Sequence, residues 1–290
     1  MAAAEGASPL RGQVIFITGA ARGIGAETAR RAVQRGAKVA LVGLEPEGLE
    51  ALAERLGEDA WWCEADVTDE DAMVAAVDGA VERFGGIDVV LANAGIAVFD
   101  PLAVLASDRF ERVVDVNLLG VWRTIRLTLP HVVARRGYVI PVASLAAAFH
   151  SPLLGPYTAT KAAVEALANV LRQEVRHLGV DVGCAYFGLI DTDMTRTGMA
   201  QAGSRTAQER LRGGPLSKPV PVGAAAEAIL RAMERRSRRA YAPKFILPAL
   251  LWRVQFQALA ERITRGQIPA AIAAAESAGP AQTTEEVARR

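Results

Sequence analysis

The chain has 290 residues, of which 51% are hydrophobic and 22% charged, so it can bury a substantial core. Its 33 Lys and Arg against 32 Asp and Glu give a net charge of +1, which excludes the strongly basic footprint of a nucleic-acid-binding protein. Its only cysteines, Cys63 and Cys184, suggest neither a metal site nor a disulfide framework, and no stretch resembles a signal peptide or approaches the ~18 apolar residues of a membrane span. We therefore expect a cytoplasmic protein with no metal and no integral membrane segment.

Short apolar runs alternate along the chain with longer stretches of helical spacing. The expected strands are residues 14–18, 38–43, 60–66, 87–95, 137–144, 180–188 and 239–243, and two long helical stretches cover about 108–135 and 157–178. The strand runs are nearly continuous Val, Ile, Leu and Ala, which is typical of parallel strands buried on both faces. This alternation predicts an α/β fold: a single doubly wound Rossmann-type domain with a parallel sheet of about seven strands.

A glycine-rich turn, "TGAARGIG" (residues 18–25), lies directly after the first strand and opens a helix. Glycine allows the backbone to approach a pyrophosphate, and the helix N-terminus supplies N–H donors and a positive dipole end. The alternative is that these glycines only permit tight packing of the strand on the helix. The position in the first βα unit favours a nucleotide, with six candidate binding residues: Thr18, Gly19, Arg22, Gly23, Ile24 and Gly25.

A tyrosine and a lysine, Tyr157 and Lys161, stand four residues apart at the start of a helical run. This spacing places them on one helix face. Two interpretations compete: a solvated helix face, or a phenol whose pKa is lowered by the neighbouring positive charge.

Seven motifs in a fixed order decide between these interpretations. They are "TGAARGIG" (18–25), "DVT" (66–68), "NAG" (93–95), "VNLLG" (116–120), Ser144, "YTATK" (157–161) and "GLIDTDM" (188–194). In these motifs the chain resembles the short-chain dehydrogenase/reductase family, from about residue 12 to residue 243. The resemblance implies that Tyr157 is the general acid/base, that Lys161 lowers its pKa and orients the ribose, that Ser144 hydrogen-bonds the substrate oxygen, and that Asn117 organises a proton relay. Each has a plainer alternative, such as a turn or cap for Ser144 and a structural hydrogen bond for Asn117.

The same resemblance implies the remaining cofactor contacts. Asp66 and Val67 would flank the adenine, Asn93, Ala94 and Gly95 would line the adenosine, and Gly188, Ile190 and Thr192 would lie by the nicotinamide and phosphates, with Tyr157 and Lys161 also touching the cofactor. Asn93 has the alternative of only tying neighbouring strands together. Neither the acidic residue that favours NAD nor the arginine that favours NADP follows the second strand. Glu45 could reach the ribose and Arg22 a phosphate, and we lean towards NAD over NADP.

These expectations define an NAD(P)-dependent oxidoreductase that transfers hydride between the nicotinamide and a secondary alcohol or ketone. A catalytically silent NAD(P)-binding regulator or scaffold is the alternative, since the fold supports both. Phe187 departs from the family pattern and would narrow the substrate pocket with an apolar ring, with His150 near its mouth. The family habit of pairing the two long helices implies a homodimer or homotetramer.

The end of the chain differs from the rest. We expect residues 10–244 to form the dinucleotide-binding and catalytic domain, and 245–290 an extension made of one amphipathic helix and a flexible tail. Trp252, Phe256, Leu259 and Ile263 recur at helical spacing and define one apolar face. This face would dock near the substrate mouth, between the segment 195–218 and a neighbouring subunit, and so favours a hydrophobic substrate; burial on another subunit or a membrane surface is the alternative.

Overall fold

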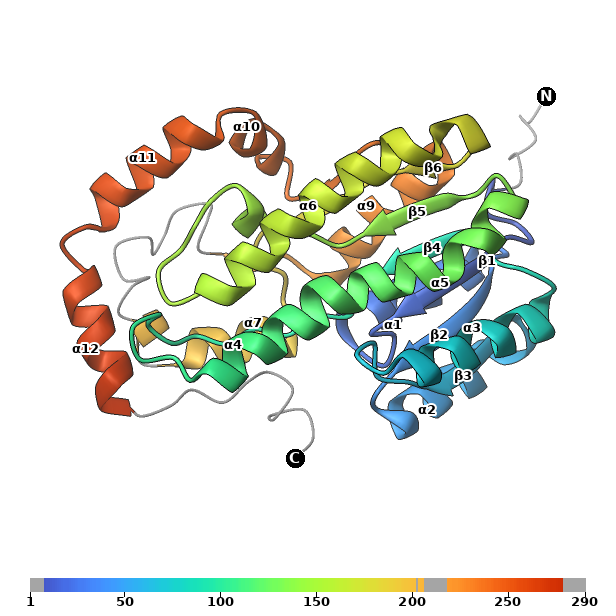
Figure 1. Cartoon of the computed structure of the whole chain (residues 1–290), viewed down its shortest axis with the longest axis horizontal. Coiled ribbons are helices and arrows are strands. Elements are labelled where there is room, and N and C mark those ends of the chain that lie inside the picture. The colour runs from blue at the N-terminus through green and yellow to red at the C-terminus, as the bar shows by residue number, and fades with distance from the viewer. Residues whose placement is uncertain (1–7, 202, 206–217, 279–290) are drawn as a thin grey trace, which may run out of the picture.

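The computed structural model describes residues 8–201, 203–205 and 218–278. A six-stranded parallel sheet lies at its centre, in the order β3-β2-β1-β4-β5-β6 (Figure 1). Its strands are β1 (Val14–Thr18), β2 (Lys38–Gly43), β3 (Ala60–Glu64), β4 (Val89–Ala92), β5 (Tyr138–Pro141) and β6 (Asp181–Val182). The winding direction reverses between β1 and β4, which creates the crevice where doubly wound sheets bind ligands. The predicted fold class, a Rossmann-type α/β domain, is confirmed.

The strand expected over 180–188 is divided. After β6 the chain leaves the main sheet, and β7 (Ala185–Phe187) pairs with β8 (Ala240–Ala242) in a small second sheet. The division falls at Gly183, whose N–H donates to Val139 O, whereas the next N–H, that of Cys184, donates to Arg238 O. A side chain at Gly183 would collide with the Tyr138 hydroxyl, so a glycine is required where the strand changes partners. The expected count of about seven strands is thus met by six strands and this small sheet.

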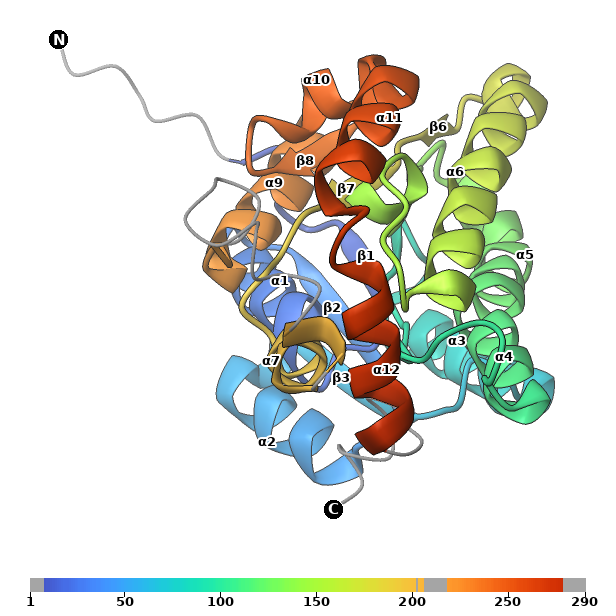
Figure 2. The ribbon, with the colours of Figure 1, turned by 90° about the vertical axis from the view of Figure 1, so that its left-hand side faces the viewer.

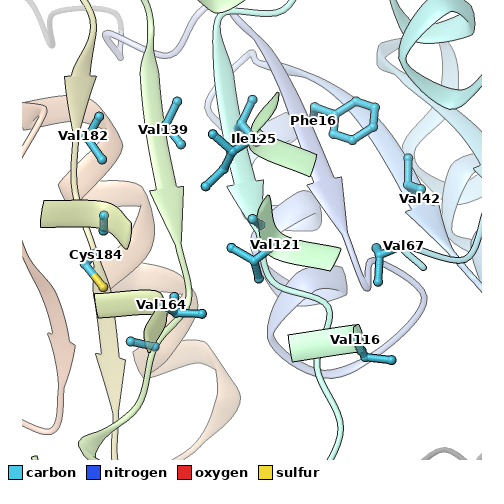
Figure 3. Close-up of a cluster of buried hydrophobic side chains, with 14 of the residues drawn as sticks. Phe16, Val42, Val67, Val116, Val121, Ile125, Val139, Val164, Val182 and Cys184 are labelled. Carbon is cyan, nitrogen blue, oxygen red and sulfur yellow. The ribbon is translucent and has the colours of Figure 1, made fainter. Parts of the chain in front are cut away.

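Helices cover both faces of the sheet, and successive strand residues point to opposite sides. One face carries α1 (Gly23–Gln34), α2 (Pro46–Leu56) and α9 (Val222–Arg235), and the other carries α3 (Glu70–Phe84), α5 (Gly120–Ala134) and α6 (Gly155–Val175). On β1, Phe16 joins the cluster under α3 and α5, which Figure 3 shows, while Ile15 and Ile17 join the cluster under α1 and α9. This two-sided burial explains why the strands are apolar at nearly every position.

The long helical stretch expected over 108–135 is not one α-helix. It consists of α4 (Ser107–Val114), a π-helical turn η2 (Asp115–Leu119) and α5. Asn117 lies in this π-helical turn, which divides the helical stretch. Three short 3-10 turns occur: η1 (Gly57–Asp59) precedes β3, η3 (Leu145–Ala147) follows β5, and η4 (Arg176–Leu178) follows α6. Helix α7 (Asp193–Ala200) follows β7.

Three helices end the described chain: α10 (Ile246–Leu251), α11 (Arg253–Thr264) and α12 (Ile268–Ala278). They form an arc along one end of the molecule (Figures 1 and 2). Ile246 and Leu250 of α10 belong to the main core cluster, so the extension begins as an integral part of the packing. The prediction of one amphipathic helix is wrong, because the chain bends at Trp252 between α10 and α11. In the part of the chain that the structure describes, no helix is long and apolar enough to cross a bilayer.

The apolar face predicted for the tail is exposed rather than docked. Trp252, Phe256, Leu259 and Ile263 are 40–59% exposed. The polar side of α11 contacts the body of the molecule, through Arg253 and Gln257. The prediction that the apolar face docks near the substrate mouth against a neighbouring subunit stays a prediction. Residues 206–217, on which part of that prediction depended, and 279–290, most of the expected flexible tail, lie outside the described residues.

Candidate active site

A cleft opens at the carboxyl ends of the strands, where the winding reverses. The residues that line it come from the turns after β1 to β5 and from α4, η2, α6 and α7: Gly19, Arg22, Gly23, Ile24, Gly43, Leu44, Glu45, Ala65, Asp66, Val67, Asn93, Ala94, Gly95, Ile96, Arg112, Val116, Val142, Tyr157, Lys161, Thr192, Asp193 and Met194. This set contains most of the residues predicted to bind a cofactor. It brings the glycine turn and the tyrosine–lysine pair, which are more than a hundred residues apart, into one cavity.

The glycines of the first turn serve both roles that the sequence left open. Gly25 is required for packing, since a Cβ there would lie 2.3 Å from Gly19 O. Gly19 and Gly23 have φ angles of +64° and +58°, a region that favours glycine, and a Cβ on Gly23 would meet only Thr192 at 3.5 Å. Gly23 therefore leaves bare backbone at the N-terminus of α1, beside the cleft, which fits a pyrophosphate.

Asn93 and Thr18 hold the turn against β4. The Asn93 side chain donates to Thr18 O at 3.0 Å and to Gly19 O at 3.1 Å, while the Thr18 hydroxyl accepts from the N–H groups of Asn93 and Ala94. Thr18 is buried and does not line the cleft. These contacts match the alternative interpretation of Asn93 as a tie between strands, although Asn93, Ala94 and Gly95 also line the cleft.

Three ion pairs lie among the residues that line the cleft. Arg22 Nε donates to Glu45 Oε1 at 3.0 Å, and Arg22 also lies 3.4 Å from Asp193. The carboxylate of Asp66 accepts from Thr68 N at 2.9 Å and from Arg112 at 2.9 Å. The Thr68 hydrogen bonds and Arg112 hold the pKa of Asp66 below its usual value, although burial opposes them. The Asp66 carboxylate therefore stabilises its own loop through these partners. Both Asp66 and its neighbour Val67 line the cleft.

The tyrosine and lysine lie on one face of α6, as predicted. Lys161 Nζ is 5.6 Å from the centre of the Tyr157 ring and donates to Val142 O at 2.9 Å. Lys161 is 3% exposed, so this is no solvated helix face. Burial lowers the pKa of Lys161 to about 8.

The expected lowering of the tyrosine pKa is absent from the chain by itself. Burial raises the pKa of Tyr157, and hydrogen bonding with Ser144 offsets part of that rise. Lys161, whose ammonium donates to Val142 O, is not among the groups that shift the pKa of Tyr157.

Asn117 and Ser144 have defined partners around this pair. The Asn117 amide closes a ring with Ile96, donating to its O at 2.9 Å and accepting from its N at 2.8 Å, and it donates to Thr160 at 3.3 Å. A side chain at Gly95 would approach both Asn117 and Lys161 to 3.3 Å, so these two groups adjoin. Ser144 accepts from Ala146 N and donates to Phe187 O at 3.4 Å. Ser144 therefore caps η3, which matches its plainer interpretation, and also reaches Tyr157.

Several predicted residues lie outside the cleft lining. Ile190 is buried and bridges to Val220, and Gly188 packs against Pro243 and Ile246. Phe187 is 4% exposed and belongs to the core cluster beneath α9, so the prediction that it narrows the substrate pocket is wrong. As the last residue of β7, it points into the packing between sheet and helix.

A second cavity lies between the 149–154 loop and the C-terminal helices. Its lining is half apolar and half polar: Phe99, Phe149, His150, Ser151, Pro152, Leu154, Ser204, Gln257, Ala260, Glu261, Thr264, Gln267 and Ile268. His150 lines this cavity, and its backbone N–H donates to Gln257 of α11 at 2.8 Å. Its predicted place near the substrate mouth stays a prediction. Among the described residues no group of three or more His, Cys, Asp and Glu is placed to hold a metal.

Sequence reasoning did not assign several residues of the cleft lining to the site: Ala65, Ile96, Arg112, Val116, Val142, Asp193 and Met194. Val116, Asp193 and Met194 belong to quoted motifs, and Ala65 and Ile96 adjoin them, so the motifs themselves were the available signal. Arg112 gave no signal, because an arginine on a polar helix face looks like any other, and only the fold brings it to Asp66.

Comparison with known proteins defines the class. Residues 13–202 match the family model for short chain dehydrogenases, and the chain belongs to this family. It is 36% identical over 221 residues to L-fucose dehydrogenase of Oryctolagus cuniculus, covering 74% of this chain and 78% of that protein. It is 37% identical to a 3-alpha-(or 20-beta)-hydroxysteroid dehydrogenase of Mycobacterium bovis, covering 64% and 72%.

Two further similarities are to a much longer protein and to a crystal structure that contains NADH. The chain is 37% identical over 190 residues to glycine betaine reductase of Emericella nidulans, covering 64% of this chain but only 15% of that longer protein. The crystal structure of 3-ketoacyl-(acyl-carrier-protein) reductase from Brucella melitensis, complexed with NADH, superposes with a TM-score of 0.72 at 27% identity, covering 80% of this chain and 97% of that one.

Proposed function

We propose that this chain is an NAD(P)-dependent oxidoreductase that interconverts a secondary alcohol and a ketone. The observation that carries the proposal is the shared cleft, which has bare backbone at the N-terminus of α1 at one end and the Tyr157–Lys161 pair at the other. A dinucleotide that spans this distance would place its nicotinamide beside the tyrosine. When bound, the nicotinamide supplies the hydride acceptor or donor.

The residues around Tyr157 divide the proton chemistry between them. Burial keeps the Tyr157 phenol protonated, so it can donate directly to the oxygen of a ketone. In the oxidative direction it must first lose that proton, and the charged form of Lys161 beside the ring favours the phenolate. Ser144 is placed to hold the substrate oxygen, and Asn117 fixes Thr160 and the loop at Ile96 around the lysine.

Exchange of Tyr157 for phenylalanine tests the acid/base role. Tyr157→Phe should keep the fold and the dinucleotide affinity but lower kcat by at least about 10²-fold, since general acid/base catalysis contributes about 10²–10⁴-fold. Steady-state rates with a panel of alcohols and ketones, and binding of NADH by fluorescence, measure both effects. Tyr241→Phe is the matched control, because Tyr241 packs against the core away from the cleft. A native-like kcat for Tyr157→Phe would contradict the proposal, and binding of NADH without turnover of any substrate by the unchanged protein would favour the silent scaffold.

We propose NAD as the preferred cofactor. Glu45 lines the cleft and places a carboxylate where a 2′-phosphate of NADP would be repelled. Its partner Arg22 opposes this preference, because Glu45 engages only the Nε of the guanidinium and the other nitrogens could attract a 2′-phosphate. We expect Glu45→Ala to improve NADPH binding by roughly tenfold, about the 1.4 kcal/mol of one lost like-charge contact. A native preference for NADP that Glu45→Ala leaves intact and Arg22→Ala abolishes would reverse the assignment.

The substrate that we propose is hydrophobic in part. Phe149, Pro152 and Leu154 form an apolar part of the wall of the second cavity. They belong to the segment of the chain between Ser144 and Tyr157. The relative named as a hydroxysteroid dehydrogenase acts on a substrate of this kind. We further propose that residues 10–244 form the catalytic domain and 245–290 its extension.

We also propose a homodimer or homotetramer built on α5 and α6. Exposed apolar side chains on this side, Trp122 at 44% and Val170 at 51%, support it. The two free thiols, Cys63 and Cys184, are compatible with a reducing compartment such as the cytosol.

A further inference from the structure

Four arginines line a hollow of about 550 Å³ beside the first residue of β6, which we call the arginine hollow. They come from two parts of the chain, the end of α6 with η4 and the segment between α9 and β8: Arg172, Arg176, Arg236 and Arg238. The rest of the lining is Asn169, Gln173, Val180, Asp181 and Val182. The hollow lies where β6 and β8 begin, whereas the candidate active site opens where the strands end, so the two are at opposite edges of the sheet (Figure 1).

The lining of the arginine hollow has an excess of positive charge. Asp181 is its one carboxylate, and it lies 3.4 Å from Arg236. The other three arginines have no ion pair with another described residue. Glu234, which is close by in the sequence, pairs instead with Arg35 of α1. Four arginines against one carboxylate leave three positive charges in excess.

Two of the guanidinium groups are held by neutral partners. Arg172 donates from Nε to Val182 O at 2.6 Å and from Nη1 to Asn169 Oδ1 at 2.8 Å. Arg236 donates from Nη1 to Arg136 O at 2.7 Å. Burial lowers the pKa of Arg172, and the positive charge of Arg238 lowers it further, so these two guanidinium groups lie close enough to repel each other. The hydrogen bonds therefore orient the cations without neutralising them.

The carbonyl ends of two helices account for part of this cluster. Arg176 directly follows α6 and Arg236 directly follows α9, and the negative end of a helix dipole attracts cations. Each helix end is equivalent to about half a negative charge, so the two together offset about one of the three positive charges. About two positive charges are left, and the repulsion between Arg172 and Arg238 remains unexplained by the helices.

The remaining charge and the type of side chain indicate the ligand. A phosphate group carries about −1.5 to −2 charges at pH 7, which matches the remaining charge of the arginine hollow. Guanidinium groups bind phosphate oxygens through paired N–H donors, and Arg238 has no side-chain hydrogen bond to another described residue. A nucleic acid is not favoured, because the whole chain has a net charge of only +1. We propose that the arginine hollow binds the phosphate group of a small molecule, either free phosphate or a phosphate ester.

This site is independent of the proposed oxidoreductase activity. The arginine hollow shares no lining residue with the cleft or with the second cavity. A phosphate there would join the end of α6, the start of β6 and the segment between α9 and β8. Because it would bind the folded chain only, it should also stabilise the fold.

Calorimetric titration tests the proposal on the full chain saturated with NADH, so that the cleft is filled. We expect saturable binding of inorganic phosphate or of glycerol phosphate, and a rise in Tm beyond that produced by NaCl at the same ionic strength. Whichever of the two binds more tightly distinguishes free phosphate from a phosphate ester. Arg238→Gln should weaken this binding at least about tenfold, because the phosphate loses a charge-assisted hydrogen bond.

Arg262→Gln is the matched control, because it removes one exposed arginine from α11, which lies far from β6 (Figure 1). It should bind phosphate as the native chain does. No saturable binding by the native chain, an effect that NaCl reproduces, or unchanged binding by Arg238→Gln would overturn the proposal. Loss of binding in Arg22→Gln but not in Arg238→Gln would assign the anion to the cleft instead, whether or not NADH binds there. Binding of a poly-glutamate peptide without binding of either phosphate would assign the surface to an acidic protein segment.

Discussion

Helices α9 and α11 have similar lengths and a clear apolar face, yet they use that face in opposite ways. Helix α9 buries Ile229 and Met233 against the sheet, and its polar residue Glu227 faces the arginines of α1. Helix α11 instead contacts the protein through Arg253 and Gln257 and exposes Phe256. Helical periodicity thus identifies which residues share a face, but the surface that lies opposite decides which face packs.

The largest expected effect is a difference in stability between substitutions on the buried apolar face of α9 and on the exposed apolar side chains of α11. Ile229→Ala removes buried methyl groups from α9 and should lower the free energy of unfolding by about 2–5 kcal/mol. Leu259→Ala on α11, where the side chain is 54% exposed, should change it by less than about 0.5 kcal/mol. Chemical denaturation of both variants measures the difference. Equal losses would mean that Leu259 is buried in solution, and the contrast between the helices would fail.

The second effect concerns how the free energy of unfolding depends on pH. The buried Lys161 of α6 should change it by up to about 3 kcal/mol, whereas the exposed cations of α11 should not. Burial lowers the pKa of Lys161 from 10.5 to about 8, so between these values the unfolded chain binds more protons than the folded one. The free energy of unfolding therefore rises with pH through that window, by about 1.4 kcal/mol per unit. Below pH 8 the folded protein carries the full cost of the buried charge.

Lys161→Met abolishes this contribution. Denaturation between pH 7.5 and 10 should show the native chain gaining about 2–3 kcal/mol relative to Lys161→Met, while the raised pKa of Tyr157 affects both proteins alike. Arg262→Met on α11 serves as the control and should show no such gain. A difference that stays constant across this range would mean that Lys161 keeps an ordinary pKa.

The smallest effect concerns the polar contact that attaches α11. Arg253→Ala should cost about 1–2 kcal/mol, because the Glu165 carboxylate, only 11% exposed, loses its bidentate partner. Adding Glu165→Gln should recover part of the loss, since the unpaired charge is then removed. Hydrogen exchange of the α11 amides should accelerate in Arg253→Ala. Protection that stays native would show that α11 is held by something other than this pair.

The tertiary structure corrected two local predictions for the same reason. Phe187 was expected to narrow the substrate pocket with its apolar ring, but alternation along β7 directs it into the core under α9. The tail was expected to begin as one amphipathic helix, but it divides at Trp252 into α10, which packs in the core, and α11, whose large apolar side chains are exposed. In both cases spacing alone did not say which neighbour a side chain would meet.

The amino-acid sequence by itself determined the doubly wound sheet, the family and the grouping of the tyrosine with the lysine. Strand burial, the glycine turn and the four-residue helical spacing are local properties that the chain carries in its pattern. Only the tertiary structure decided that Arg112 reaches Asp66, that Lys161 is buried deeply enough to lower its pKa, and that α11 presents its apolar side outwards. These are consequences of which surfaces meet, and burial and charge pairing depend on neighbours that lie far away in the sequence.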